Sequence, residues 1–476
     1  MLIFIAVTLY FIALFLISRL SARRATNAAF FRGERRSPWW MVAFGMIGAS
    51  ISGVTFVSVP GMVLTSSMTY LQLCLGFILG YVAVAFVLLP VYYKLNLTTI
   101  YTFLGQRLGR KSYLTGAWFF LLSKMAGAAL KFYVVCMILG TSPTYADGGM
   151  NYRFLLVTIG MVTLIWLYTR KGGIRTLVFT DVFQTTCLFT ALLLIIYKVM
   201  TDMGMSVADM IQAVTGDERS SVFVFSDWTS PQNFWKQLLS GMFIVIVMTG
   251  LDQDMMQKNL TCRSLRDAQK DMCTYGLAFL PANMLFLALG VLLAQLFEAN
   301  GIALPVKGDE MLPMFVSHTG GVVLVLFVIG IMAASFSSAD SALTSLTTSY
   351  CVDIRNRQDD ERLRRRTHLV MCVVFVVFII VFDAVNSKSL IDAIYTVVSY
   401  TYGPLLGLFA FGLFTKSNVR DKLVPYVCVA APLLCYAIDY VAKTRYDYHF
   451  GYELLLINGL ITFAGLWTLR CRVKRL

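Results

Sequence analysis

A group of hydroxyl and carboxylate side chains interrupts an apolar segment within residues 330–353. The preceding residues 321–329 are apolar, so we expect this segment to enter a bilayer. Ser337, Asp340 and Ser341 are spaced i, i+3 and i+4, which places them on one face of a helix. Carboxylate and hydroxyl oxygens at membrane depth suit a hard cation such as Na⁺. Small residues also ease helix packing in membranes, which explains the serines but not the costly Asp340.

Asp181 is a second carboxylate that we expect inside a span. It follows the basic residue Arg175 by about 9 Å along a helix, at about 1.5 Å per residue. Asp340 lies about 20 Å from Arg355 by the same rise, so both carboxylates are expected in the same half of the bundle. Gln184 is one turn from Asp181 and is placed to orient it. The alternative is that Asp181 reaches the nearby basic loop.

The composition indicates a protein that crosses a membrane many times. Of its 476 residues, 58% are hydrophobic and 14% are charged, whereas soluble proteins carry about 25% charged residues. The net charge of +14 does not predict nucleic-acid binding, because the lysines and arginines lie in short loops between apolar segments. We expect an all-α polytopic membrane protein with one transmembrane domain, residues 1–476. Its surroundings would be membrane lipid, with no nucleic-acid partner.

Cysteine and histidine usage predicts no transition-metal centre and no cofactor. The ten cysteines form no CxxC pair, and the three histidines form no cluster with metal-ligand spacing. The sequence shows no nucleophile–base pair and no phosphate-binding loop, so an enzyme is not expected. Na⁺ is the only metal ion that the sequence predicts.

Apolar runs predict about thirteen transmembrane helices, since a span needs about 20 apolar residues. The expected spans are 2–18, 38–64, 70–93, 112–140, 152–169, 174–200, 236–257, 271–298, 320–354, 367–384, 391–414, 423–441 and 450–469.

The basic residues predict the orientation of these spans. Most of the 40 lysines and arginines, Lys258 among them, lie in the loop after the first span, in every second loop thereafter, and in the C-terminal tail. By the positive-inside rule the N-terminus is expected outside and the C-terminus in the cytoplasm, with the protein in the cell (inner) membrane. Residues 2–18 lack a basic n-region and a small-residue cleavage site, so we interpret them as a retained helix.

Two apolar segments are interrupted near their middle. Residues 45–61 read GMIGASISGVTFVSVPG, and residues 242–257 read MFIVIVMTGLDQDMMQ. Interrupted spans at matching positions of two halves indicate a transporter with inverted repeats, in which unwound backbone offers carbonyl oxygens to cations. The alternative is two ordinary glycine-containing helices, because glycine is frequent in membrane spans.

The motifs taken together resemble the sodium:solute symporter family. They are FFRGERRSPWWMVAFGMIGASISGVTF (30–56), TRKGGIRTLVFTDVFQ (169–184), TGLDQDMMQKNL (249–260), AASFSSADSALTS (333–345) and YGPLLGLFAFGLF (402–414). The resemblance implies a LeuT-like fold with inverted five-helix repeats at 38–200 and 236–414. One extra N-terminal helix (2–18) and two extra C-terminal helices (423–469) would complete it.

The resemblance also implies a principal sodium site. Gly48 and Ile51 would give carbonyl oxygens from the first interrupted helix. Ala334 would give a carbonyl, and Ser337 and Ser338 would give hydroxyls, from the helix that contains the serine-rich segment.

Some family members have a second sodium site, which here would use Asp181, Asp340 and Ser341. Asp340 stands where some members have a hydroxyl. Two carboxylates would either bind Na⁺ more strongly, or one of them would hold a proton.

The solute pocket implied by the resemblance lies between the interrupted helices and their neighbours. Its candidate contacts are Ser50, Ser52, Thr55, Gln72, Lys131, Asp252 and Gln253. Lys124 and Lys131, seven residues apart on one helix face, suit a carboxylate-bearing solute such as an acidic sugar of the sialic acid type. A sugar or polyol remains open, and the lysines alternatively pair with protein carboxylates or extend to the membrane surface.

The leading hypothesis is a sodium-coupled secondary symporter that imports a small organic solute by alternating access. A proton-coupled symporter that uses Asp181 and Asp340 is the nearest alternative. A transporter-like membrane sensor is a further alternative.

Overall fold

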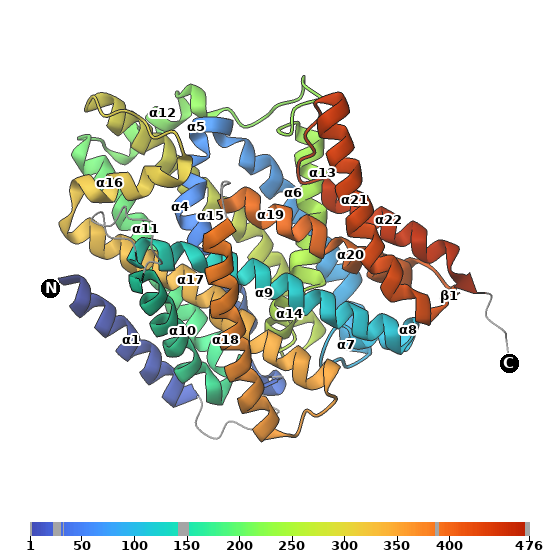
Figure 1. Ribbon diagram of the computed structural model, residues 1–476. Coiled ribbons are helices and arrows are strands. Elements are labelled where there is room, and N and C mark those ends of the chain that lie inside the picture. Colours follow the sequence, from blue (N-terminus) through green and yellow to red (C-terminus); the bar gives the residue numbers. More distant parts are fainter. Residues whose placement is uncertain (1, 22–29, 32, 141–151, 386–389, 472–476) are drawn as a thin grey trace.

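Helices account for most of the described chain (Figure 1). The computed structural model describes residues 2–21, 30–31, 33–140, 152–385 and 390–471. In chain order the helices are α1 (Leu2–Ser21), α3 (Trp39–Ser50), α4 (Gly53–Gly61), α5 (Val63–Ser66), α6 (Tyr70–Ala83), α7 (Leu89–Lys94), α8 (Thr102–Arg107), α9 (Arg110–Gly140), α10 (Tyr152–Gly172), α11 (Ile174–Asp202), α12 (Val207–Thr215), α13 (Phe234–Val245), α14 (Gln253–Asn259), α15 (Leu265–Ala299), α16 (Met311–Thr319), α17 (Gly321–Ser349), α18 (Glu361–Val385), α19 (Leu390–Thr401), α20 (Gly403–Phe414), α21 (Val424–Tyr446) and α22 (Leu454–Thr468). Two short strands, β1 (Asn418–Val419) and β2 (Arg470–Cys471), pair antiparallel and join the end of α20 to the end of α22.

The structure confirms an all-α polytopic membrane protein. Within the described ranges, nine helices are long and apolar enough to cross a membrane, or eleven when each bent helix pair is taken as one span. Two further apolar helices, α3 and α22, are shorter. The count of thirteen spans stays a prediction.

Both predicted interruptions are present. The first helix stops at Ile51 and resumes after Ser52, whose backbone is extended. The second continues from α13 through a π-helical segment, η5 (Ile246–Gly250), and then bends by 69° into α14. A third break, of 44°, separates α19 from α20 at Tyr402. These breaks leave backbone groups without helical partners inside the bundle, where cations and solutes can bind them.

α17 lies in the centre of the bundle. Every residue from Gly330 to Ser349 is buried, and the helix packs against α11, α9, α4 and α3. Its many serines and alanines let neighbouring backbones approach closely, as small residues do in membrane proteins. The serine-rich segment that opened the sequence analysis is therefore enclosed by protein on all sides.

α6 and α13 touch backbone to backbone. A Cβ atom at Gly76 would lie 2.2 Å from the carbonyl oxygen of Leu238, and one at Gly241 would lie 2.3 Å from the carbonyl oxygen of Leu73. Only glycine fits at both positions, because any side chain would separate the two helices.

Candidate functional site

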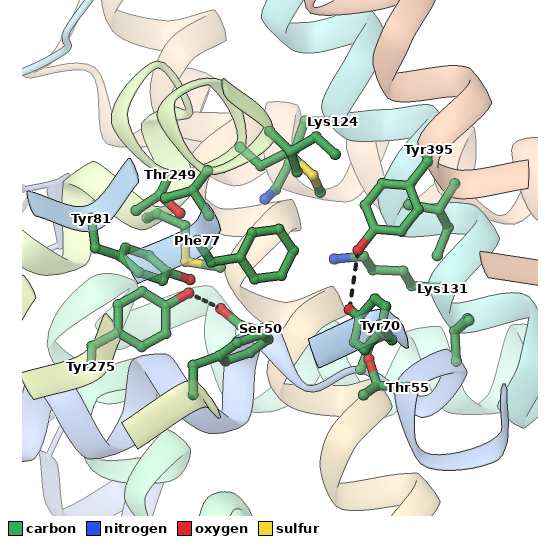
Figure 2. Close-up of a pocket in the computed structure, with 18 residues that line it drawn as sticks. Ser50, Thr55, Tyr70, Phe77, Tyr81, Lys124, Lys131, Thr249, Tyr275 and Tyr395 are labelled. Carbon is green, nitrogen blue, oxygen red and sulfur yellow. Dashed lines mark hydrogen bonds between the residues drawn. The ribbon is translucent and has the colours of Figure 1, made fainter. Parts of the chain in front are cut away.

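A cavity lies where the two interrupted helices face each other and α6, α9, α15 and α19 surround them (Figure 2). The residues that line it are Ser50, Ser52, Val54, Thr55, Tyr70, Phe77, Tyr81, Lys124, Lys131, Ile244, Val245, Met248, Thr249, Met255, Tyr275, Phe279, Ile394 and Tyr395. Hydroxyl groups and two ammonium groups alternate with aromatic and aliphatic side chains. Such a lining binds a small solute that carries both polar groups and apolar surface.

The polar groups of the cavity form two sets. In one, the Ser50 hydroxyl is hydrogen-bonded to the Tyr275 hydroxyl, and the ring of Tyr81 packs edge-on against Tyr275 with centroids 4.5 Å apart. In the other, the hydroxyls of Tyr70 and Tyr395 lie 3.2 Å apart. Figure 2 shows Phe77 between the two sets. The cavity thus has two polar sets with an aromatic ring between them.

The two lysines of α9 differ in their partners. Lys124 Nζ lies 2.7 Å from Asp254 Oδ2 and 3.1 Å from Asp252 Oδ2, and Tyr402 donates a hydrogen bond of 2.7 Å to Asp252. Lys131 also lines the cavity, yet it has no ion-pair or hydrogen-bond partner anywhere in the described chain. Lys124 is therefore neutralised by the protein, whereas the Lys131 ammonium is available to a ligand.

A smaller cavity adjoins the first and shares both lysines with it. Its lining adds Ala49, Asp252 and Ser338. The candidate solute cavity thus neighbours the region in which α17 meets the broken end of α3.

One of the predicted principal sodium ligands, Ser338, lies at this junction. Ser338 Oγ donates to the carbonyl oxygen of Ala49 at 2.8 Å, and Ala49 lies on the last turn of α3, one residue after Gly48. A Cβ atom at Gly48 would lie 1.9 Å from Thr185 Oγ1 of α11, so only glycine permits this approach. The structure therefore brings together α3, α11 and α17. Thr185, whose buried hydroxyl has no partner within the described residues, was not singled out in the sequence.

The region of the predicted second sodium site contains an unexpected cation. Lys258 Nζ of α14 lies 2.8 Å from Asp181 Oδ2, and both side chains are at most 2% exposed. Asp340 Oδ2 accepts a hydrogen bond of 2.7 Å from Tyr168. Asp340 Oδ1 and Ser341 Oγ are buried and have no hydrogen-bond partner in the described part of the chain. The assignment of Lys258 to a cytoplasmic loop was wrong, because Lys258 belongs to α14, which follows the 69° bend and is buried along its whole length.

The candidate solute contacts are not all found in one place. Ser50, Ser52, Thr55 and Lys131 line the first of the two cavities described above. Asp252 lines the smaller one, where Lys124 and Tyr402 bind it.

Two glutamines predicted as solute contacts line neither cavity. The side chain of Gln72 donates to the carbonyl of Gln232 at 2.9 Å and accepts from the backbone N–H of Val224 at 3.2 Å, so it fixes the loop before α13. Gln253 accepts from Ile100 N at 3.0 Å and donates to the Thr98 carbonyl at 3.2 Å. In this structure both amides hold loops instead of facing a solute.

Comparison with known proteins identifies the family. The model of the sodium:solute symporter family matches residues 30–420, and the chain belongs to this family. The sodium/sialic acid symporter NanT of Aliivibrio fischeri is 26% identical over 450 residues, which are 90% of this chain and 86% of that protein. The sodium/sialic acid symporter SiaT of Proteus mirabilis is 24% identical, over 93% of this chain and 90% of that protein.

Solved structures establish the fold. A substrate-bound, outward-open structure of a Na⁺-coupled sialic acid symporter superposes with a TM-score of 0.81 at 20% identity, covering 98% of this chain and 97% of that one. Mhp1, a nucleobase-cation-symport-1 family transporter in a closed conformation, gives a TM-score of 0.57 at 14% identity over 93% of this chain. The LeuT-like transporter fold expected from the sequence is thereby confirmed.

Proposed function

We propose that this protein is a sodium-coupled symporter for a small organic acid of the sialic acid class. The observation that carries the proposal is the ammonium group of Lys131, which has no partner among the described residues and faces a cavity lined by hydroxyls. A buried ammonium without an anion is costly, and a carboxylate on the solute would neutralise it. The hydroxyl groups of Ser50, Thr55 and the tyrosines would bind the hydroxyls of the same solute.

The principal sodium site that we propose consists of the carbonyls of Gly48, Ile51 and Ala334 and the hydroxyls of Ser337 and Ser338. Support comes from the contact between Ser338 and Ala49, which joins α17 to the broken end of α3. Oxygen ligands of this kind are those that hard cations prefer.

Coupling follows from the position of the break. Ser50 and Ser52 line the cavity, and they flank Ile51, one of the proposed carbonyl ligands. Na⁺ bound there would fix the geometry of both serines and so favour solute binding. By linkage, the solute would tighten Na⁺ binding by the same factor.

For the membrane placement, we propose the cell (inner) membrane with the N-terminus outside and the C-terminus in the cytoplasm. The basic loops of the sequence support this orientation. Only Tyr10, Leu14 and Ser18 of α1 are buried, so the other faces of this apolar helix are suited to contact with lipid.

The deciding experiment measures uptake of radiolabelled sialic acid into proteoliposomes that contain the purified protein. We expect uptake with an inward Na⁺ gradient and none with a pH gradient in Na⁺-free buffer. Equal uptake in the Na⁺-free buffer would instead favour a proton-coupled symporter. Uptake of a neutral sugar in preference to sialic acid would reject the acidic solute while keeping sodium symport.

Ser338→Ala tests the sodium site. Loss of one hydroxyl ligand, worth about 1 kcal/mol, should raise the Na⁺ concentration for half-maximal uptake roughly three- to ten-fold. Ser345→Ala is the matched control, since Ser345 lies two turns further along α17 and, within the described residues, its hydroxyl bonds to the Ala342 carbonyl of the same helix alone. Identical Na⁺ dependence in both variants would place the sodium site elsewhere.

A further inference from the structure

Lys258 is a buried cation that the coupling scheme above does not use. It lies on α14, within the second interrupted span, and its side chain is 2% exposed. Its ammonium group is 2.8 Å from Asp181 of α11. The pair therefore connects two helices at the centre of the bundle. An ammonium at this depth needs such a counter-charge, because an unpaired one is costly.

Both oxygens of the Asp181 carboxylate are engaged. Oδ1 accepts a hydrogen bond of 2.7 Å from Ser337 Oγ, and Oδ2 faces Lys258. Ser337 is adjacent in sequence to Ser338, which contacts the broken end of α3. Asp181 is therefore the carboxylate nearest in the hydrogen-bond network to the proposed principal sodium site.

This is the position at which a second Na⁺ would have to sit if Asp181 were its ligand. A second cation beside Asp181 would lie next to the Lys258 ammonium, and like charges at close range in a buried site repel strongly. Lys258 cannot leave easily either, since its side chain is enclosed by protein and its charge would lose its partner.

We propose that the Lys258 ammonium permanently takes the place of a second coupling cation, so that the protein binds and carries one Na⁺ per solute. This inference rests on the proposed sodium symport and adds its stoichiometry. A tethered cation balances Asp181 throughout the cycle without being released, whereas a second Na⁺ would add its own gradient to the driving force. By fixing the number of Na⁺ ions carried per solute, Lys258 thus limits the solute concentration gradient that the protein can build up.

Asp340, the other carboxylate of this region, provides the alternative in which a second Na⁺ does bind. Asp340 lies three residues from Ser337 on α17, and its Oδ1 has no hydrogen-bond partner among the described residues. If Asp340 and Ser341 held a second ion beside the Lys258 pair, the wild-type protein would bind two Na⁺.

The test counts bound ²²Na⁺ at saturation on the purified full-length protein in detergent at pH 8. We expect one Na⁺ per wild-type molecule. Lys258→Gln frees the Asp181 carboxylate and should raise the count to two. Lys258→Arg, which keeps the positive charge, is the matched control and should stay at one. The double variant Asp181→Asn with Lys258→Gln leaves no unpaired charge and should also bind one.

Two Na⁺ on the wild-type protein would overturn the inference while leaving sodium symport intact. A folded Lys258→Gln protein that still binds one Na⁺ would overturn it as well. No Na⁺ on the wild-type protein would overturn the proposed symport itself, and the inference with it. Should Lys258→Gln fail to fold, the wild-type count and the double variant still decide.

Discussion

Lys124 and Lys131 lie on the same helix, two turns apart, and border the same cavity, but their surroundings are opposite. Lys124 is 13% exposed and is held by the carboxylates of Asp252 and Asp254 at the break before α14. Lys131 has no such partner in the described chain. A buried lysine in this bundle therefore has either a structural role, when protein carboxylates bind it, or a ligand-binding role, when they do not. The presence of a protein partner distinguishes the two roles better than the depth of burial does.

The largest expected effect comes from Lys124→Gln. This change leaves two buried carboxylates without their cation, and breaking a buried pair costs about 3–5 kcal/mol. Thermal unfolding of the detergent-solubilised protein should shift to clearly lower temperature and expression should fall. Lys171→Gln, at an exposed lysine at the end of α10, should unfold like the wild type. An unchanged melting temperature for Lys124→Gln would show that the ion pair is not structural.

Lys131→Gln should have the converse result. No protein group loses its partner, so stability should hold, while affinity for sialic acid should fall about ten- to one-hundred-fold, equivalent to about 1.4–2.8 kcal/mol. Binding can be measured by calorimetry in saturating Na⁺, with Lys131→Arg as the charge-keeping control. A variant that binds sialic acid as well as the wild type does would remove Lys131 from the site and end the contrast between the two lysines.

Sequence patterns predicted the parts of this contrast that depend on local spacing. The i, i+3, i+4 serines and Asp340, the two interrupted helices, and the shared face of Lys124 and Lys131 could all be read from the chain. The ion-pair partners of these residues could not be predicted from the sequence, because Lys124 and Asp252 are 128 residues apart and meet only where a helix bends. Hydropathy likewise placed Lys258 in a loop, since the polar residues of α14 give no sign in the composition that this helix is buried.

The positions of Gln72 and Gln253 outside the two cavities have the same physical origin. Both are polar residues in spans next to the breaks, which made them reasonable solute contacts. Backbone groups of neighbouring loops bind their amides instead. A buried amide satisfies such loop groups as well as it would a solute, and sequence alone does not distinguish the two uses.

The smallest expected effect comes from Tyr70→Phe, which removes one hydroxyl from the pair that Tyr70 and Tyr395 form in the cavity. A single neutral hydrogen bond contributes about 0.5–1.5 kcal/mol, so affinity for sialic acid should fall about two- to ten-fold. Tyr92→Phe is a suitable control, because Tyr92 is buried away from the cavity and donates to the Gly250 carbonyl. A loss as large as that of Lys131→Gln would shift the main anchor of the solute from the ammonium to the tyrosine pair.

The glycine contact between α6 and α13 has a mechanical consequence. A Cβ atom at Gly76 would lie only 2.2 Å from a carbonyl oxygen of α13, so no side chain separates the two backbones at this point. Direct backbone contact of this kind resists sliding of one helix along the other. The two helices are therefore expected to move together as one rigid body, along with the cavity-lining residues Phe77 on α6 and Val245 on α13. A change between outward and inward access to the cavity must then come from movement at other helix contacts, such as those of α9, which contributes Lys124 and Lys131 to the cavity.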